Sequence, residues 1–326
     1  MADNSKRHVL VTGANSGLGF EAAAQFAEEG FGRVTITARS SEKAEQAQLE
    51  LVSRTGSEVF ATLTLDNHLL DTVDSAADVL IERSHSIDVL VLNAGIAPTP
   101  HVAYTPDGLE ATVAATLTGH HRLTKRLLDA GLLENDAHIV IAGSEAARGD
   151  VPMMNPMDMH TFAADHFDGD LEAAIEAQIR LQTPARYKSG DVYATTKMFA
   201  AWWAAELADR VPASTVVTAV SPGSAPDTNA VRSAPLYMRR VMIPLFKAMP
   251  ARMRMAGTVG EGANRYLQAA DFGPEASGKF YASKPRRMTG KLVEVDLPHL
   301  QDNEGQKALW AVTERMTRGA GQPSAV

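Results

Sequence analysis

The amino-acid sequence predicts an α/β fold built on a doubly wound parallel sheet with helices on both faces. Short apolar runs rich in β-branched residues alternate with longer segments of helical periodicity. The runs are almost continuously apolar, as strands covered on both faces should be. A glycine-rich turn joins the first run to the first helical segment. Together these observations are typical of right-handed βαβ units.

Each apolar run is a candidate strand, and the segments between them are candidate helices. The expected strands are HVLVTG (8–13), RVTITAR (33–39), EVFATLTLD (58–66), IDVLVLNAG (87–95), AHIVIAGS (137–144), STVVTAVSPG (214–223) and, as the last, GKFYAS (278–283). The first helices are expected over GLGFEAAAQFAEEG (17–30), SSEKAEQAQLELVSRTG (40–56) and residues 71–84. Ser41 is expected to be the N-cap of the second helix.

The chain is expected to form a single domain over residues 1–326, because neither an internal repeat nor a low-complexity tract divides it. Residues 1–143 contain most of the βαβ pattern. Two less regular segments follow, an insertion over 145–190 and a second segment over 224–257. The tail at 318–326, RGAGQPSAV, is expected to be flexible.

The composition is that of an ordinary globular protein, with 45% hydrophobic and 21% charged residues. A formal net charge of -8 argues against a nucleic-acid partner. The chain has no cysteine, which excludes disulfides and thiolate metal ligands, and we expect no metal site. Neither a signal peptide nor an integral membrane segment is recognisable, so we expect a soluble, cytoplasmic protein.

The glycine-rich turn VTGANSGLG places Gly13, Gly17 and Gly19 between the first strand and its helix. A pyrophosphate can approach a helix N-terminus closely only where side chains leave room, and glycine provides that room. The spacing is G-x-x-x-G-x-G, which differs from the commonest dinucleotide fingerprint. The alternative is a structural turn without a ligand. The strand before it and the helix after it favour a dinucleotide, and residues 1–143 would then form mainly the dinucleotide-binding half.

Tyr193 and Lys197 are four residues apart in DVYATTKMF, so a helix would place both on one face. Taken alone, this spacing favours an ordinary surface pair, because Tyr-x-x-x-Lys occurs by chance in many soluble proteins.

In combination, these motifs resemble those of the short-chain dehydrogenase/reductase family, and in particular its carbonyl reductase-like and retinol dehydrogenase-like members. TGANSGLG (12–19) matches the cofactor motif of that family. Asn93-Ala94-Gly95 matches its motif after strand four, with Leu92 in place of the first Asn. Ser144 stands at the end of strand five, where the family has its catalytic serine, and Pro222-Gly223 matches its turn after strand six. The resemblance therefore implies a single-domain Rossmann-type fold and an oxidoreductase.

The resemblance also implies a set of functional residues. The catalytic residues would be Ser144, Tyr193 and Lys197. The cofactor-binding residues would be Gly13, Asn15, Ser16, Gly17, Leu18, Gly19, Arg39, Asp66, Asn93, Ala94, Gly95, Tyr193, Lys197, Pro222, Gly223 and Thr228. Thr228 would contact the nicotinamide carboxamide.

The end of strand two predicts the cofactor preference. An NAD site has an acidic residue there, whereas this strand ends TAR and the first acid is Glu42. Arg39 offers a planar set of donors suited to a 2′-phosphate, so NADP(H) is preferred over NAD(H). Thr37 and Ser40 could add hydrogen bonds. Asp66 corresponds to the family's residue at the adenine amino group, and it could also serve as a helix N-cap.

Reduction of a carbonyl group requires a proton donor at its oxygen and a group that holds that oxygen. Tyr193 is the expected general acid and base, and Ser144 the group that orients the oxygen. An unperturbed tyrosine has a pKa of about 10, and the Lys197 ammonium is expected to lower it. The resemblance implies that Lys197 also holds the nicotinamide ribose.

Two positions near the expected site need separate interpretation. Thr116 stands where the family commonly has a relay asparagine, so its hydroxyl could replace that relay, or turnover could be slower. His120 and His121 are neighbours on a helix and cannot bind one metal ion together, so we expect structural roles.

The substrate side is expected to be apolar. The Met-rich start of the insertion, VPMMNPMDMHTF, could form a wall or lid, or a surface excursion with its own small core. The 224–257 segment corresponds to the family's substrate-binding loop. The apolar face formed by Phe199, Trp202 and Trp203 must be covered, either by a partner or by the insertion, and we favour a monomer over a homodimer. Trp310 is expected to pack in the core.

The sequence thus predicts an NADP(H)-dependent reductase of a bulky apolar ketone or aldehyde, reversible as an alcohol dehydrogenase. Two alternatives stay open: a carbon–carbon double-bond reductase of the same family, and an NADP(H)-binding sensor or scaffold with low activity.

Overall fold

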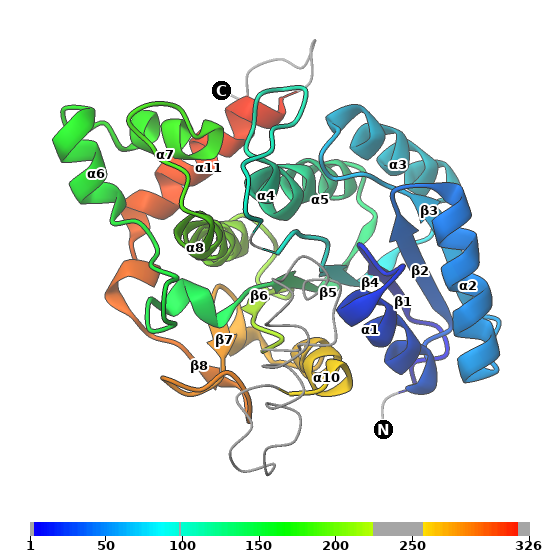
Figure 1. Cartoon of the computed structure of the whole chain (residues 1–326). Coiled ribbons are helices and arrows are strands. Elements are labelled where there is room, and N and C mark those ends of the chain that lie inside the picture. Colours follow the sequence, from blue (N-terminus) through cyan, green and yellow to red (C-terminus); the bar gives the residue numbers. More distant parts are fainter. Residues whose placement is uncertain (1–2, 98, 224–256, 319–326) are drawn as a thin grey trace.

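An eight-stranded sheet forms the centre of the computed structural model (Figure 1), which describes residues 3–97, 99–223 and 257–318. The strand order is β3-β2-β1-β4-β5-β6-β7-β8. The strands are β1 His8–Val11, β2 Arg33–Ala38, β3 Phe60–Thr64, β4 Ile87–Leu92, β5 Leu133–Ala142, β6 Val216–Val220, β7 Phe280–Ala282 and β8 Val293–Glu294. All neighbours pair in parallel except β7 and β8, which are antiparallel. The predicted α/β fold is confirmed.

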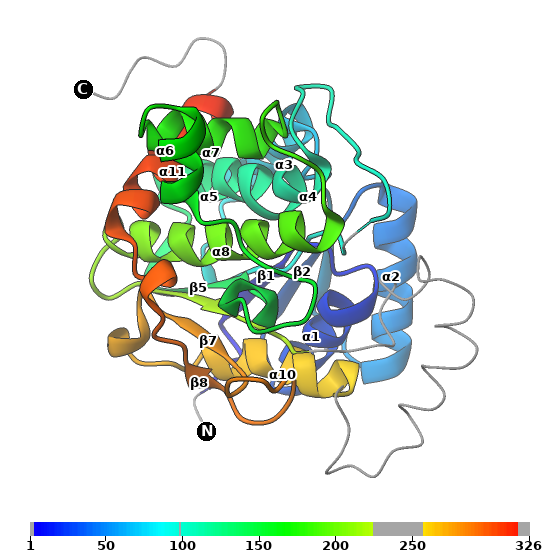
Figure 2. The same cartoon turned by 60° about the vertical axis from the view of Figure 1, so that its left-hand side comes forward.

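Helices cover both faces of the sheet (Figure 1 and Figure 2). One face packs against α1 (Gly17–Glu28), α2 (Ser41–Thr55) and α10 (Val259–Ala269). The other packs against α3 (Leu70–Arg83), α5 (Gly119–Asp129) and α8 (Ser189–Ala208). The remaining helical segments of the described residues are α4 (Ala111–Val113), the π-helical η1 (Ala114–Thr118), η2 (Glu145–Arg148), α6 (Met159–His166), α7 (Leu171–Arg180), η6 (Pro274–Ala276), η7 (Pro298–Leu300) and α11 (Asn303–Thr317).

The order of the strands determines where a ligand can bind. The chain builds outward from β1 to β3 and then crosses back to β4 on the other side of β1. The loops after β1 and β4 therefore separate at the carboxyl edge of the sheet, which is the usual ligand position in such folds. The glycine-rich turn follows β1, and Asn93 follows β4.

Two details differ from the sequence prediction. The N-cap of α2 is Ser40 rather than Ser41, and its hydroxyl accepts a hydrogen bond from the Lys43 amide at 3.4 Å. The 278–283 strand is not the last, because residues 293–294 form β8 beside it. A two-residue strand has too little alternation to be recognised in a sequence.

The insertion packs into the core of the main sheet. Met159 and Phe162 of α6 belong to the same apolar cluster as α8 and α11, so the insertion has no separate core of its own. Met153, by contrast, is largely exposed.

The apolar face of α8 is covered within the chain. Phe199, Trp202 and Trp203 are fully buried in the cluster that α7 and α11 share. The Trp202 indole donates to the His299 carbonyl at 2.7 Å. Trp310 of α11 is also buried, so its predicted packing role agrees with the structure.

The 224–257 segment, except Gly257, and all of the predicted tail except Arg318 lie outside the described residues. Among the helices of the described ranges, none combines the length and the apolar composition that a membrane crossing would need.

Candidate active site

The glycine-rich turn lies against β2 and against the loop after β4. The Gly13 amide donates to the Thr37 hydroxyl at 3.0 Å, and the Ala14 amide donates to the Thr37 carbonyl at the same distance. Gly13 has a φ of +64°, and a Cβ there would stand 3.0 Å from the Ala94 Cα. Glycine therefore allows both the left-handed turn and the close contact between the two loops.

Gly19 is required for close packing rather than for a special backbone angle. A Cβ at this position would stand 2.5 Å from the Asn93 amide nitrogen and 2.6 Å from the Gly13 carbonyl oxygen. Asn93 itself donates to the Thr12 carbonyl at 2.9 Å. The turn, the first residues of α1 and the end of β4 thus form one packed unit.

The beginning of α1 fits a pyrophosphate. The side chain of Ser16, the N-cap residue of α1, makes no capping hydrogen bond to this helix, as is also the case for the N-cap residues of α3 and α8, whereas Ser40, Asp158 and Asp170 cap α2, α6 and α7. Backbone amides at an uncapped N-terminus attract an anion. Asn15, Ser16 and Leu18, predicted from the sequence to bind the cofactor, lie in this turn. The backbone amides at the beginning of α1 are thus compatible with the predicted pyrophosphate site.

A buried chain of hydrogen bonds connects the glycine-rich turn to η1. The Thr12 hydroxyl accepts from the Ala94 amide at 3.0 Å and also contacts His120 Nε2 at 2.9 Å. His120 Nδ1 lies 3.0 Å from the Thr116 carbonyl oxygen. Burial lowers the pKa of His120 to about 3. The neutral ring therefore connects η1 to the glycine-rich turn and, through Thr12, to the loop after β4. This is the structural role expected of His120.

His121 points elsewhere, as neighbouring helical residues should. Its Nε2 lies 3.0 Å from a Glu314 carboxylate oxygen, and its Nδ1 accepts from the Trp203 indole at 3.0 Å. Within the described residues, no group of His, Asp and Glu side chains is arranged to hold a metal ion.

Ser144 lies where β5 ends and η2 begins. The Gly143 amide donates to the Val220 carbonyl at 2.9 Å, which holds the end of β5 beside β6. Ser144 is the N-cap of η2, and its hydroxyl accepts from the Ala146 amide at 3.2 Å.

Tyr193 and Lys197 lie one turn apart on α8, and α8 places them beside Ser144. Tyr193 lies close enough to Ser144 for the serine hydroxyl to influence the pKa of the phenol. The Lys197 ammonium lies 5.8 Å from the centre of the Tyr193 ring and donates to the Ala142 carbonyl at 2.7 Å. The structure thus brings together all three predicted catalytic residues.

The electrostatics of Tyr193 differ from the prediction. Burial raises the pKa of Tyr193, the nearby Ser144 hydroxyl opposes that rise, and the charge of Glu145 adds to it. Lys197 is not among the groups that shift this pKa, although its ammonium lies 5.8 Å from the centre of the ring. Burial also lowers the pKa of Lys197 to about 8. At neutral pH, Tyr193 is therefore a neutral phenol, the form that can donate a proton.

Gly95 and Thr116 adjoin Lys197. A Cβ on Gly95 would stand 3.3 Å from the Thr116 hydroxyl oxygen and 4.0 Å from Lys197 Nζ. The Thr116 hydroxyl is buried and has no hydrogen-bond partner among the described residues. A proton relay through this residue stays a prediction.

The adenosine side contains Arg39 and Asp66. Arg39 follows β2 and is exposed, and no hydrogen bond to another described residue occupies its guanidinium. Asp66 follows β3, where its Oδ1 accepts from the amide and the ring of His68 at 3.1 and 2.7 Å. Leu69, rather than Asp66, is the N-cap of α3.

Two neighbours of Arg39 have other functions than expected. Thr37 is buried, and its hydroxyl serves the glycine-rich turn instead of a 2′-phosphate. The hydroxyl of Ser40 caps α2.

Pro222 and Gly223 follow β6 at the same edge of the sheet. Thr228 lies outside the described residues.

Tyr266 of α10 is a further residue of the site that the sequence motifs did not predict. It is fully buried, and its hydroxyl donates to Asn93 Oδ1 at 3.3 Å. In the sequence, the helical period of α10 indicates only that Tyr266 is one of several buried positions.

Known proteins resemble this chain in sequence and in fold. A sequence model described as short chain dehydrogenase matches residues 7–158. Retinol dehydrogenase 13 of Homo sapiens is 27% identical over 321 residues, which cover 97% of this chain and 86% of that protein.

Two solved structures are similar in fold. An uncharacterized protein from Mycobacterium Paratuberculosis has a TM-score of 0.66 at 25% identity, covering 96% of this chain and 93% of the other. L-Sorbose reductase from Gluconobacter frateurii, solved with NADPH and L-sorbose, has a TM-score of 0.64 at 16% identity. That match covers 89% of this chain and all of the other.

Proposed function

Since this chain is an oxidoreductase of the short-chain dehydrogenase/reductase family, we propose that it reduces a bulky apolar ketone or aldehyde with NADPH and oxidises the alcohol in reverse. The observation that supports this most strongly is the meeting of Ser144, Tyr193 and Lys197 at the carboxyl edge of the sheet. The glycine-rich turn ends at the same edge.

Each of the three side chains would have a different role at the substrate oxygen. Ser144 would donate a hydrogen bond to the carbonyl oxygen and orient it. Tyr193, a neutral phenol at neutral pH, would give its proton to that oxygen as negative charge develops there. Lys197 would keep a positive charge beside the phenolate that remains. The cofactor supplies the hydride.

The binding of NADP(H) is proposed from the residues at the strand ends. The α1 N-terminus and Gly13, Gly17 and Gly19 would receive the pyrophosphate. Arg39 would bind the 2′-phosphate, because its guanidinium is exposed at the end of β2. NADPH in L-sorbose reductase shows that this fold can hold that cofactor in another protein.

An apolar substrate is proposed from the similarity to retinol dehydrogenase 13, whose name states an apolar alcohol as its substrate.

A screen of NADPH oxidation tests the proposed function. Bulky apolar ketones, aldehydes and enones are offered separately, and products are identified by mass spectrometry. We expect alcohols from ketones or aldehydes, with one NADPH consumed per alcohol formed. Saturated ketones from enones would instead indicate a double-bond reductase. NADPH binding without turnover of any compound would overturn the proposal in favour of a sensor or scaffold.

A further inference from the structure

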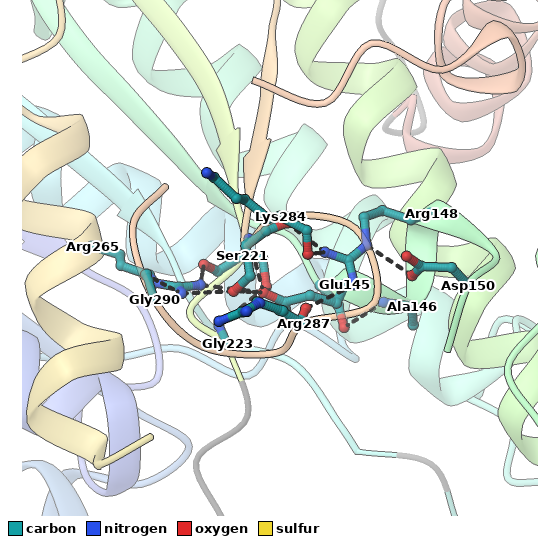
Figure 3. Close-up of polar contacts among 12 residues, drawn as sticks. Glu145, Ala146, Arg148, Asp150, Ser221, Gly223, Arg265, Lys284, Arg287 and Gly290 are labelled. Carbon is teal, nitrogen blue, oxygen red and sulfur yellow. Dashed lines mark hydrogen bonds and ion pairs between the residues drawn. The ribbon is translucent and has the colours of Figure 1, made fainter. Parts of the chain in front are cut away.

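A buried ion pair lies directly beside Ser144, outside the groups that the proposed chemistry uses. Glu145 follows Ser144 in η2, and Arg265 belongs to α10. Both are almost fully buried, and Arg265 Nη1 lies 3.2 Å from Glu145 Oε1. Figure 3 shows Arg265 and Glu145 on either side of Ser221, which follows β6.

Four donors converge on the Glu145 carboxylate. Oε1 accepts from Arg265 Nη1 at 3.2 Å, and from the amide and hydroxyl of Ser283 at 3.3 and 2.9 Å. Oε2 accepts from the Ser221 hydroxyl, which in turn accepts from the Gly223 amide at 3.1 Å. Since an ionised carboxylate can only accept hydrogen bonds, this set of donors fits the charged form of Glu145.

Arg265 connects the same carboxylate to three further segments. Its Nη1 donates to the Ser221 carbonyl at 2.8 Å. Its Nη2 donates to the Ser283 hydroxyl and the Gly290 carbonyl, both at 2.8 Å. The pair therefore joins η2 and α10 to the ends of β6 and β7 and to the loop before β8 (Figure 3).

Stability alone explains such a pair poorly. The cost of removing two charges from water often exceeds the attraction gained, and apolar replacements of similar volume can be equally stable. Buried charged groups are better attested where they specify one arrangement over others. The arrangement specified here is that of the Ser144 turn relative to the Gly223 turn, on adjacent strands of the sheet.

We propose that Glu145 and Arg265 are a positioning pair for the candidate active site, which holds the Ser144 turn beside Tyr193 and balances the charge next to it. This proposal rests on the roles proposed above for Ser144 and Tyr193. Both residues act through their neighbours, so neither is a catalytic residue.

The charges of Glu145 and Arg265 should shift the pKa of Tyr193 in opposite directions. Among the described residues, the titratable groups that interact with Tyr193 are Glu145 of η2, Lys197 of α8 and Tyr266 of α10, and Arg265 stands next to Glu145. The negative charge of Glu145 raises the pKa of Tyr193. Removing that charge should lower the pKa, and removing the cation that balances it should raise the pKa further.

Nuclear magnetic resonance of protein labelled with ¹³C at the tyrosine Cζ tests this directly. Tyr193 is assigned by the signal lost in Tyr193→Phe, and its pKa is read from a pH titration. We expect a lower pKa in Glu145→Gln, a higher one in Arg265→Met, and a value near that of the wild type in the double variant. A pair with only a structural role would lower the melting temperature of every variant without opposite pKa shifts, which would overturn the proposal.

Arg148→Met is the matched control. Arg148 is another buried arginine beside the same cluster, and its hydrogen bonds go to Asp150 and to the carbonyls of Ser283, Lys284 and Arg287. We expect this variant to be less stable but to keep the Tyr193 pKa of the wild type. A shift equal to that of Arg265→Met would contradict a specific role for the Glu145–Arg265 pair.

The kinetics provide a second measurement. Misplacement of Ser144 should lower kcat by about tenfold or more in Glu145→Gln, while the Kd for NADPH changes little.

If the wild type reduces no carbonyl compound, the proposed function fails, whereas the titration still decides the positioning claim. If Arg265→Met does not fold, Glu145→Gln decides alone, since glutamine has nearly the same volume as glutamate and removes only the charge, and an unchanged Tyr193 pKa would overturn the proposal.

Discussion

At the residue scale, the candidate site depends on a tyrosine that keeps its proton and a lysine that is close to losing its own. Burial raises the pKa of Tyr193 and lowers that of Lys197 to about 8. Both shifts favour the neutral forms, as expected where water is excluded. The proposed reduction uses the neutral phenol, so the surroundings of Tyr193 suit proton donation.

The lowered pKa of Lys197 predicts a dependence of stability on pH. Between about 8 and the ordinary value of 10.5, the unfolded chain binds a proton that the folded chain releases. The contribution of Lys197 to the free energy of unfolding therefore rises with pH across this window and is smallest below pH 8. From pH 7 to about 9.5, the free energy of unfolding of the wild type should gain about 1–2 kcal/mol relative to Lys197→Met. Urea denaturation measures this, and a difference that does not change with pH contradicts it.

Arg39 is the residue on which the proposed cofactor preference depends. Losing a charged hydrogen bond to the 2′-phosphate should weaken NADPH binding by about tenfold or more in Arg39→Ala. NADH lacks that phosphate, so its affinity should hardly change. Fluorescence titration with each cofactor measures both values. Arg33→Ala, at the other end of β2, is the control and should bind NADPH as the wild type does. Equal losses for NADH and NADPH in Arg39→Ala would argue against a phosphate contact.

At the element scale, the glycine-rich turn is held by close contacts from two neighbouring loops. Gly19→Ala would press a methyl group against Asn93 and the Gly13 carbonyl. We expect a loss of about 1–3 kcal/mol in the free energy of unfolding, together with much weaker NADPH binding. Gly260→Ala, in the first turn of α10, has no atom closer than 3.5 Å to the new Cβ and is the control. Thermal unfolding and NADPH titration compare the two, and equal behaviour would contradict the packing described for Gly19.

The elements of the sheet could be predicted from the sequence because their apolar runs are long and bounded by turn residues. All seven expected strands and the three expected helices form, with boundaries shifted by a few residues. The short β8 and the choice of Ser40 as N-cap could not be predicted, because each depends on a local pairing or backbone angle.

The convergence of the catalytic residues was predictable for a similar reason, since each stands at a strand end or on one face of a helix. The contacts that hold these residues in place could not be predicted. Thr37, Tyr266 and Arg265 are ordinary strand or helix residues in the sequence, and their partners lie far away in the chain. Glu145 would be taken for a solvated helix residue, because burial of a charge depends on tertiary packing.

At the scale of the whole molecule, we propose a monomer, because the apolar face of α8 is covered within the chain. The Trp203 indole bonds to His121, the Trp202 indole bonds to the His299 carbonyl, and both rings are buried. With this face buried against its own chain, it offers no apolar surface to a second copy. Light scattering after size-exclusion chromatography should therefore give the mass of one chain. Twice that mass at micromolar concentration would contradict this proposal. The cytoplasmic location predicted from the sequence stays a prediction.

The central claim is that Tyr193 delivers the proton that completes carbonyl reduction with NADPH. The most direct measurement compares the wild type with Tyr193→Phe on the best substrate of the screen, with NADPH affinity determined for both proteins. The account predicts that kcat falls by about a hundredfold or more, the usual contribution of a general acid, while NADPH binds with nearly unchanged affinity. A Tyr193→Phe variant that reduces the carbonyl at the rate of the wild type would contradict it.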